Sequence, residues 1–489
     1  MINIDIDLGS WWLIAVFVFD VVIRIAAIII VPRNRRPTAA MAWLLAIYFI
    51  PVIGVVLFLV IGTPRLPRKR RRKQRAINEY IQQATAGLDH GTLRPGAPGW
   101  FTSLVRLNTN LGAMPLSGDN EAHLIADYQE SLDAMADAIR SARRYVHVEF
   151  YILQADASTD NFFRALEEVS ERGVTVRVLL DHWANRGKPF YRRTLKRLDA
   201  MGAQWHLMLP VQPLRGKYQR PDLRNHRKLL VIDGDIAFMG SQNVTDSTYN
   251  LRKNIRRGLH WVDLMVRLEG PVVGSVNAVF LSDWYSETDE LLTEEVDEFD
   301  LRQATGDLDC QIVPSGPGFE FENNLRLFLG LMYAAKERII LVSPYFVPDE
   351  SILNAITTAC HRGVEVELFV SEEGDQAMVY HAQRSYYEVL LRAGVRIWMY
   401  RKPYILHTKA MTIDDEVAVI GSSNMDMRSF GLNMEISMLV RGEEFVDEMR
   451  QVEDHYRNLS TELTLEEWLR QPLRSTVLDN LARLTSALQ

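Results

Sequence analysis

The chain has 489 residues, 47% of them hydrophobic, and its 62 acidic and 55 basic residues give a formal net charge of −7 at pH 7. This length predicts two or three domains with sizeable cores, and the negative charge argues against a general nucleic-acid binder, which would be basic. The two cysteines, Cys310 and Cys360, exclude a disulfide framework and a cysteine-rich zinc site, and they fit a reducing compartment.

The first 64 residues predict a membrane anchor. Residues 11–31 are apolar apart from Asp20 and Arg24, and residues 39–62 are apolar throughout, so each segment is long enough to cross a bilayer. We therefore expect two transmembrane helices. Asp20 and Arg24 lie four residues apart and can pair on one helix face, whereas Pro51 leaves open whether the second segment is kinked and partly re-entrant.

A strongly basic segment follows the anchor. Residues 65–75 carry eight basic residues in eleven, and such an excess beside a membrane span is typical of the cytoplasmic side and of contact with anionic lipid. We expect a multi-pass protein of the cell membrane with the rest of the chain in the cytoplasm. Residues 65–115 are read as a basic juxtamembrane segment and linker, in which 100–107 lie either on the membrane surface or on the first soluble domain.

The remainder alternates helices and strands, and does so twice. The strand predicted at Val146–Ile152 is echoed at Ile340–Phe346, each followed by a helix-periodic stretch. An internal duplication explains this echo. The fold class is therefore α/β, with domains at 116–286 and 309–489 joined by an acidic linker at 287–308.

One eighteen-residue pattern occurs in each half. It joins a histidine, a lysine, an aspartate and a Gly-Ser-x-Asn tail at equal spacing: His226, Lys228, Asp233, Gly240, Ser241 and Asn243, then His407, Lys409, Asp414, Gly421, Ser422 and Asn424. In a strand the histidine and lysine share one face, and the aspartate points away from it. The aspartate is thus more typical of a turn or an orienting group than of a phosphate contact.

Two histidines and two lysines with small polar donors suit phosphoryl transfer on a diester. One imidazole can attack phosphorus, the other can protonate the leaving alcohol, and lysines neutralise the oxygens. A carboxylate usually holds the second nitrogen of such an imidazole. Asp263 and Glu435 occupy equivalent positions after the two patterns, so we predict that each orients a histidine; simple surface carboxylates are the alternative.

The doubled pattern is similar to the phospholipase D superfamily, and with its predicted anchor the chain resembles bacterial cardiolipin synthases. The resemblance implies two tandem phospholipase D-like α/β/α domains that face each other. It implies transfer of a phosphatidyl group between two phosphatidylglycerol molecules through a phosphatidyl-histidine on His226, with glycerol released. The predicted partners are phosphatidylglycerol and anionic membrane lipid, not nucleic acid, and a homodimer is left open.

The predicted site follows from the pattern and the resemblance. The catalytic set is His226, Lys228, Asp233, His407, Lys409 and Asp414; the phosphate-binding set is Ser241, Asn243, Ser422 and Asn424; and Asp263 and Glu435 orient the histidines. No metal or other cofactor is expected, because the lysines supply the positive charge. A hydrolase that uses water as the acceptor and a scaffold with a vestigial site are the alternative functions.

Overall fold

The computed structural model describes residues 8–33, 35, 37–62, 66–85, 96–212, 217–292 and 306–484. The chain divides into two compact units, Met1–Arg65 and Leu66–Gln489. Parts of the predicted linkers at 65–115 and 287–308 lie outside the described residues.

The first unit consists of three helices, α1 (Leu8–Ile30), α2 (Pro37–Phe49) and α3 (Pro51–Ile61). Of the described helices, α1 alone is long and apolar enough to cross a membrane. The predicted apolar segment at 39–62 is divided into two helices, because the helix breaks at Ile50 and restarts with Pro51 as its first residue, the proline at which the sequence left a kink open. The two short helices fold back on each other, so that a Cβ on Gly54 would lie 2.6 Å from the Ala46 carbonyl oxygen.

Charged side chains of the first unit are paired. Arg24 donates to Asp20 at 2.6 Å, as the four-residue spacing predicts. Arg35 donates to the carbonyl of Val31 at 2.6 Å and to that of Gly62 at 2.9 Å, so one guanidinium joins the ends of α1 and α3. Such carbonyls lack helical partners and need a donor.

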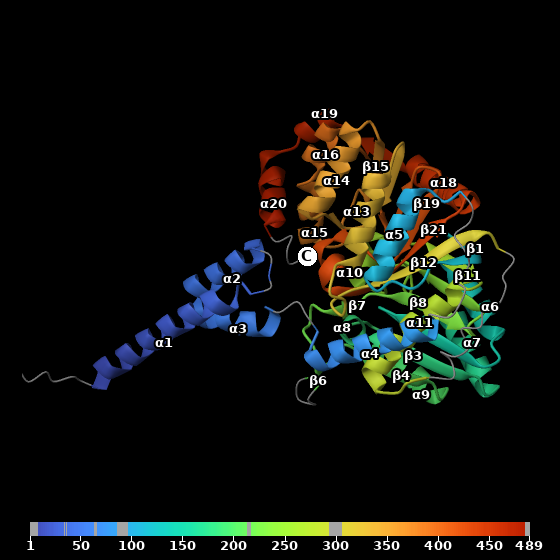
Figure 1. Cartoon of the computed structure of the whole chain (residues 1–489), viewed down its shortest axis with the longest axis horizontal. Helices are drawn as coiled ribbons and strands as arrows, with labels where there is room; N and C mark the ends of the chain where they lie inside the picture. The colour runs from blue at the N-terminus through green and yellow to red at the C-terminus, as the bar shows by residue number, and fades with distance from the viewer. Residues whose placement is uncertain are drawn as a thin grey trace, which may run out of the picture. The chain divides into compact units, whose positions relative to one another are not determined.

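The second unit is built on a sixteen-stranded sheet that shows the internal duplication (Figure 1). The first half contributes, in spatial order, β4 (Gln204–Met208), β3 (Thr175–Asp181), β2 (Tyr145–Phe150), β8 (Lys228–Ile232), β9 (Ile236–Gly240), β11 (Met265–Glu269) and β1 (Ser117–Ile125). The second half repeats this order with β16 (Arg396–Tyr400), β15 (Glu365–Ser371), β13 (Arg338–Val342), β18 (Ala410–Ile413), β19 (Val417–Gly421), β21 (Asn433–Arg441) and β12 (Leu308–Ser315). The antiparallel pair β1–β12 joins the halves, and β22 (Ser460–Leu463) lies on the outer edge beside β16. The predicted tandem α/β organisation is confirmed.

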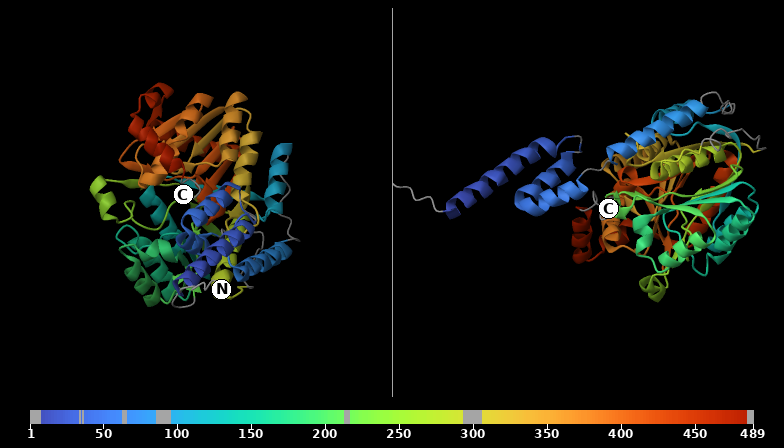
Figure 2. Two further views of the ribbon diagram at one scale, coloured as in Figure 1. Left: turned by 90° about the vertical axis from the view of Figure 1, so that its left-hand side faces the viewer. Right: turned by 90° about the horizontal axis from the view of Figure 1, so that it is seen from below.

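Helices cover the sheet (Figure 2), and their side chains form three main cores with those of the strands. Helices α11 (Val272–Thr288) and α18 (Glu443–Asn458) share one core with strands of both halves. Helices α6 (Tyr128–Arg140) and α7 (Asp160–Glu171) cover the first half, and α13 (Asn323–Ala334), α14 (Glu350–His361) and α16 (Tyr387–Ala393) cover the second. Strand β8 shows why the motif strands are apolar throughout: Leu229 and Val231 enter one core, and Leu230 and Ile232 enter another.

Shorter elements connect this frame. The helices are α8 (His182–Arg186), α9 (Tyr191–Ala200), α10 (Arg252–Arg257), α15 (Ala377–Arg384), α17 (Met427–Gly431), α19 (Leu465–Leu469) and α20 (Leu473–Arg483). The strands are β5 (Val211–Gln212), β6 (Lys217–Tyr218), β7 (Arg224–Asn225), β10 (His260–Val262), β14 (Phe346–Val347), β17 (Tyr404–Leu406) and β20 (Met425–Asp426).

Helix α4 (Arg68–Thr85) carries most of the basic segment, and one side of it packs on α11. Arg70 forms an ion pair with Glu287, and Lys73 with Asp289 at 2.5 Å. The basic residues Lys69, Arg72 and Arg75 are exposed on the opposite side. Part of the positive charge thus holds the helix to the domain, and the remainder faces outward.

Helix α5 (Gly99–Asn110) contains the apolar stretch that sequence placed on the membrane or on the first domain. Both placements are wrong, because α5 packs on α13 of the second half. Phe101 and Leu104 are buried in the core of that half, where the α13 glycine Gly330 leaves room for Leu104. The helix is therefore a structural part of the second domain.

Candidate active site

The segments that carry the two histidines cross from one half to the other. Strand β7, which ends just before His226, pairs with the start of β21, and the His226 amide donates to the Met434 carbonyl at 2.8 Å. Strand β17, which ends just before His407, pairs with β10, and the His407 amide donates to the Val262 carbonyl at 2.7 Å. Each histidine is thereby fixed beside the residue that precedes the other half's predicted carboxylate.

This pairing brings each imidazole to a carboxylate of the other half. His226 Nδ1 lies 2.9 Å from Glu435 Oε2, and His407 Nδ1 lies 2.7 Å from Asp263 Oδ1. Both carboxylates are completely buried. With Nδ1 held in this way, Nε2 is the nitrogen that each imidazole can present to a ligand. The structure therefore gives Asp263 and Glu435 the contacts that an orienting role requires.

The motif serines support these carboxylates instead of facing a ligand. Ser241 donates its hydroxyl to Asp263 at 2.6 Å, and Ser422 donates to Glu435 at 2.5 Å. Both serines are fully buried. Each hydroxyl proton is thus committed to a neighbouring charge in this structure, and the predicted contact with a phosphate would need it to turn.

The motif aspartates lie in the hairpin turns and not beside the imidazoles, as the odd spacing after the lysine predicts. Asp233 accepts the backbone amides of Arg143, Arg144 and Tyr145 at 2.7 to 2.8 Å, where β2 begins. Asp414 likewise accepts the amides of residues 336–338, where β13 begins. Both have positive φ, at 52° and 50°, in the hairpin that follows the motif strand. They close the turn and anchor it to the neighbouring strand.

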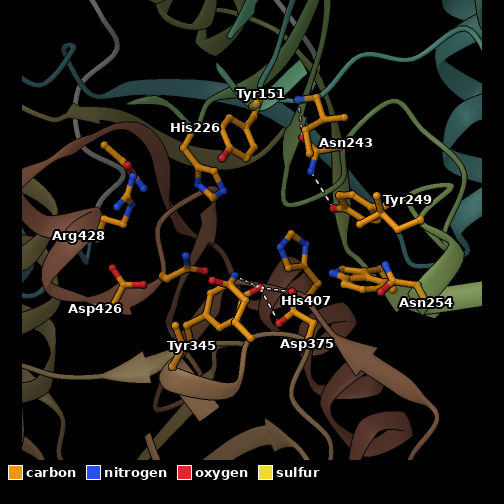
Figure 3. Close-up of a pocket in the computed structure, with 18 of the residues that line it drawn as sticks. Tyr151, His226, Asn243, Tyr249, Asn254, Tyr345, Asp375, His407, Asp426 and Arg428 are labelled. Carbon is orange, nitrogen blue, oxygen red and sulfur yellow. Dashed lines mark hydrogen bonds between the residues drawn. The ribbon is translucent and has the colours of Figure 1, made fainter. Parts of the chain in front are cut away.

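Both histidines line one cavity of about 600 Å³ (Figure 3). His226 and His407 point into it from opposite walls, and Asn243 and Asn424 also line it. Its apolar wall includes Ile152, Trp261, Val347 and Met378. A cavity of this volume is large enough to hold a phosphodiester.

The motif lysines are buried directly behind the histidines. Lys228 Nζ donates to the His226 carbonyl, and Lys409 Nζ donates to the His407 carbonyl, each at 2.5 Å. Each ammonium retains further protons for a ligand oxygen. The asparagines differ: Asn243 donates to Tyr249 at 2.8 Å and accepts the Ile152 amide, whereas Asn424 Oδ1 is buried without a hydrogen-bond partner among the described residues.

Burial dominates the protonation states of this site. It lowers the pKa of both His226 and His407 to about 4, with the neighbouring lysines acting in the same direction. It lowers the pKa of Lys409 to about 7, against the pull of Asp263 and Glu435, and it lowers that of Lys228 strongly. Burial alone would raise the pKa of each orienting carboxyl, but the adjacent imidazole keeps it below its ordinary value. An anionic phosphate would favour the protonated form of all four basic groups.

Several cavity residues were missed by sequence reasoning. Tyr151 lies with its ring 4.8 Å from that of His226, and Tyr345 is 6.5 Å from His407. These tyrosines are equivalent in the strand echo at 146–152 and 340–346, so the repeat held a signal for them. Asp375, which accepts from Tyr345 at 3.1 Å, and Arg428, which donates to the Asp222 carbonyl at 2.9 Å, have no counterpart in the other half.

A metal site needs several His, Cys, Asp or Glu side chains that converge on one point. Within the described ranges, no group of three or more His, Cys, Asp or Glu side chains has an arrangement that could hold a metal ion. The positive groups that face the cavity are protein side chains, among them Lys188, Lys253 and Arg428.

Comparison with known families and proteins identifies close relatives. The family model described as "Cardiolipin synthase, PLD-like domain" matches twice, at residues 135–268 and 328–456, and "Phospholipase_D-nuclease N-terminal" matches residues 21–62. The chain is 32% identical to "Cardiolipin synthase A" of Klebsiella pneumoniae (strain 342), over 98% of this chain and 97% of the relative. It is 31% identical to the protein of the same name from Proteus mirabilis (strain HI4320), over 93% and 94%.

A solved structure shares the fold. The chain is similar to "phosphatidylserine synthase" of Haemophilus influenzae Rd KW20, with a TM-score of 0.59 and 15% identity over 78% of this chain and 99% of that one. At this identity the likeness concerns the fold alone.

Proposed function

The chain belongs to the family of cardiolipin synthases with phospholipase D-like domains, and from this premise we propose that it joins two phosphatidylglycerol molecules into cardiolipin and releases glycerol. The observation that carries the mechanism is a pair of imidazoles in one cavity, each held at Nδ1 by a buried carboxylate. Two such groups provide one nucleophile and one acid–base catalyst for a double displacement.

In the first step, His226 Nε2 attacks the phosphorus of the donor lipid. A phosphorus–nitrogen bond forms, the bond from phosphorus to the headgroup oxygen breaks, and protonated His407 gives its proton to the departing glycerol. The donor thus becomes a phosphatidyl-His226. We assign the attack to His226 from resemblance to the superfamily. Glu435 stabilises the positive charge that the ring gains, because its carboxylate accepts the Nδ1 proton at 2.9 Å.

In the second step, His407 is neutral and takes a proton from a headgroup hydroxyl of the second lipid. That oxygen attacks phosphorus, the bond to His226 breaks, and cardiolipin leaves. The two steps consume two phosphatidylglycerols and yield one cardiolipin and one glycerol. His407 ends protonated and ready for the next donor.

Positive charge and amide donors hold the phosphate through both steps. Lys228 and Lys409 neutralise the non-bridging oxygens, and Asn243 and Asn424 supply hydrogen bonds. Because burial lowers the pKa of Lys228, Lys409 and His407, binding of the anionic phosphate would draw protons onto these groups, whereas His226 stays neutral at Nε2 and can attack. The positive charge of the site therefore increases when a substrate binds.

The family membership and the apolar helix α1 support a membrane-associated location. We propose that α1 anchors the enzyme in the cell membrane and that the second unit lies on the cytoplasmic side. The exposed basic residues Lys69, Arg72 and Arg75 of α4 suit contact with anionic lipid at that surface. Whether α2 and α3 reach the opposite side decides between a single-pass and a multi-pass anchor.

A product assay tests the function. The purified full chain should convert phosphatidylglycerol, supplied as the only lipid, into equal amounts of cardiolipin and glycerol. Phosphatidic acid as the main product would instead identify a hydrolase that uses water as the acceptor. Failure of the unsubstituted chain to consume the lipid, with a His226→Ala variant equally inert, would favour a scaffold.

A further inference from the structure

Helix α20 has an unusual orientation, because it packs on the protein through its polar side. Asp479, 2% exposed, pairs with His381 at 2.6 Å and with Arg384 at 3.3 Å, both on α15. Ser475 accepts from Arg384 at 3.0 Å. Amphipathic helices of soluble domains normally turn their apolar side inward.

The outward side of α20 is apolar. Leu473, Val477, Leu481 and Leu484 recur at helical spacing along the helix and its end, and they are 83%, 56%, 56% and 80% exposed. Leu469 of α19 extends this surface and is 54% exposed. A continuous stripe of large apolar side chains on the surface is typical of a docking face.

The charges of α20 indicate what covers the stripe. Besides the buried Asp479, its charged residues are Arg474, which is exposed beside the stripe, and Arg483, which is exposed and lies with its guanidinium 4.8 Å from the Tyr386 ring. An apolar stripe flanked by basic residues is the pattern of a helix that lies in the surface of an anionic bilayer.

The position of α20 relative to the cavity supports the same partner. Helix α20 packs on α15 (Figure 1), and α15 begins beside Gln376, with Met378 and Val379 lining the cavity. Met378 is 56% exposed, so apolar side chains are exposed both on α20 and at the cavity. A lipid leaving the bilayer at α20 would meet the cavity within the length of one short helix, about 12 Å for eight residues.

We propose that α20 is a second membrane-contact element, which lies in the bilayer surface and holds the cavity entrance against it. The proposal rests on the proposed function in taking a membrane lipid as substrate and α1 as the anchor. With α1 in the bilayer, the chain tethers the second unit to the membrane, so that even a weak interfacial helix would bind there. Helix α20 would then set the orientation of the cavity, and α1 would supply only attachment.

Site-directed labelling tests the placement without reference to activity. Cys360→Ser removes the half-buried thiol, Cys310 is fully buried, and Val477→Cys and Thr476→Cys then place an environment-sensitive fluorophore on the stripe or beside it. In the full chain, reconstituted in vesicles that contain phosphatidylglycerol, the label at 477 should be blue-shifted. Brominated acyl chains should quench it at least about twofold more than the label at 476.

Two results would overturn the proposal. Equal quenching at both positions would show that the stripe is not the side of α20 that enters the bilayer. A blue-shifted label at 477 that brominated lipid does not quench would show that protein, such as a second copy of the chain, covers the stripe.

A matched pair of charge variants links the contact to turnover. Val477→Glu should lower cardiolipin formation from vesicle phosphatidylglycerol roughly fivefold, whereas Thr476→Glu should not, because a carboxylate at the centre of an interfacial stripe opposes docking. Dispersed short-chain phosphatidylglycerol should be converted equally by both variants, which also shows that both fold. Equal vesicle rates for the two variants would refute the link. Failure of the proposed function itself would appear separately, as no cardiolipin from dispersed substrate with the unsubstituted chain.

Discussion

Replacement of Glu435 by glutamine is the most direct test of the imidazole–carboxylate pair. The carboxylate accepts hydrogen bonds from His226 at 2.9 Å, Ser422 at 2.5 Å, Ser429 at 2.9 Å and Asn433 at 3.3 Å. All four partners are donors. The NH2 group of glutamine is also a donor, so it has to face at least one of them and cannot accept its hydrogen bond. The variant loses the negative charge and one acceptor while keeping nearly the same volume.

The expected loss follows from the strength of a charged hydrogen bond. A bond to an ionised group contributes about 1.5–3 kcal/mol. At about 1.4 kcal/mol per factor of ten, its loss in the transition state should lower kcat roughly 10- to 150-fold. Binding of phosphatidylglycerol should persist, because Glu435 itself does not line the cavity.

Initial rates of cardiolipin formation, measured together with lipid binding, test this role of Glu435. Glu453→Gln is the matched control, because Glu453 is also buried, at 1% exposure, and accepts from Thr412 at 2.6 Å and Arg450 at 2.8 Å. That variant should lose stability without a fall in kcat of the folded protein. If Glu435→Gln turned over within about twofold of the unsubstituted enzyme, the proposed role of the carboxylate would be refuted.

Four further outcomes are expected. Asp233→Ala should lower the free energy of unfolding in denaturant by about 1–3 kcal/mol, with little change in kcat. A fall in kcat without a loss of stability would instead indicate a catalytic role for this aspartate. Binding of inorganic phosphate at pH 8 should take up protons, because the pKa of Lys409 is about 7 in the empty site and the anion raises it; calorimetric heats that do not vary with buffer ionisation would contradict this. In a His407→Ala variant, a trapped lipid-phosphorylated peptide should contain His226, and a modified peptide with His407 in the unsubstituted enzyme would reverse the assignment. A chelator should leave the rate within about twofold of its original value, and a strong loss that a divalent ion restores would show that the lysines do not suffice.

The sequence predicted the paired site well where the repeat itself carried the signal. The doubled pattern identified both histidines, and the equivalent positions of Asp263 and Glu435 predicted their partners. The direction of the serine hydroxyls could not be predicted, because it depends on how the strands of each half place Ser241 beside Asp263 and Ser422 beside Glu435. Asp375 and Arg428 gave no signal, since neither recurs in the duplicated pattern.

Hydropathy was less informative about the arrangement of apolar helices. Residues 39–62 are apolar enough for a span, yet the helix ends at Phe49 and restarts at Pro51, because proline lacks the amide that a continuous helix needs. Helix α20 shows the same limit, because amphipathic spacing by itself predicts its apolar side inward. Only the buried pairs of Asp479 reveal that the helix is inverted.

The pairing of β7 with β21 and of β17 with β10 makes the two halves chemically inseparable. Each half contributes one histidine to the cavity and one carboxylate to the histidine of the other half. An isolated half would therefore have a histidine without the carboxylate that fixes its tautomer. Two fragments expressed apart should be individually inert, and they would regain turnover only by reassociating. Selection therefore acts on both copies of the duplicated domain together, because a mutation that inactivates one copy also impairs the other.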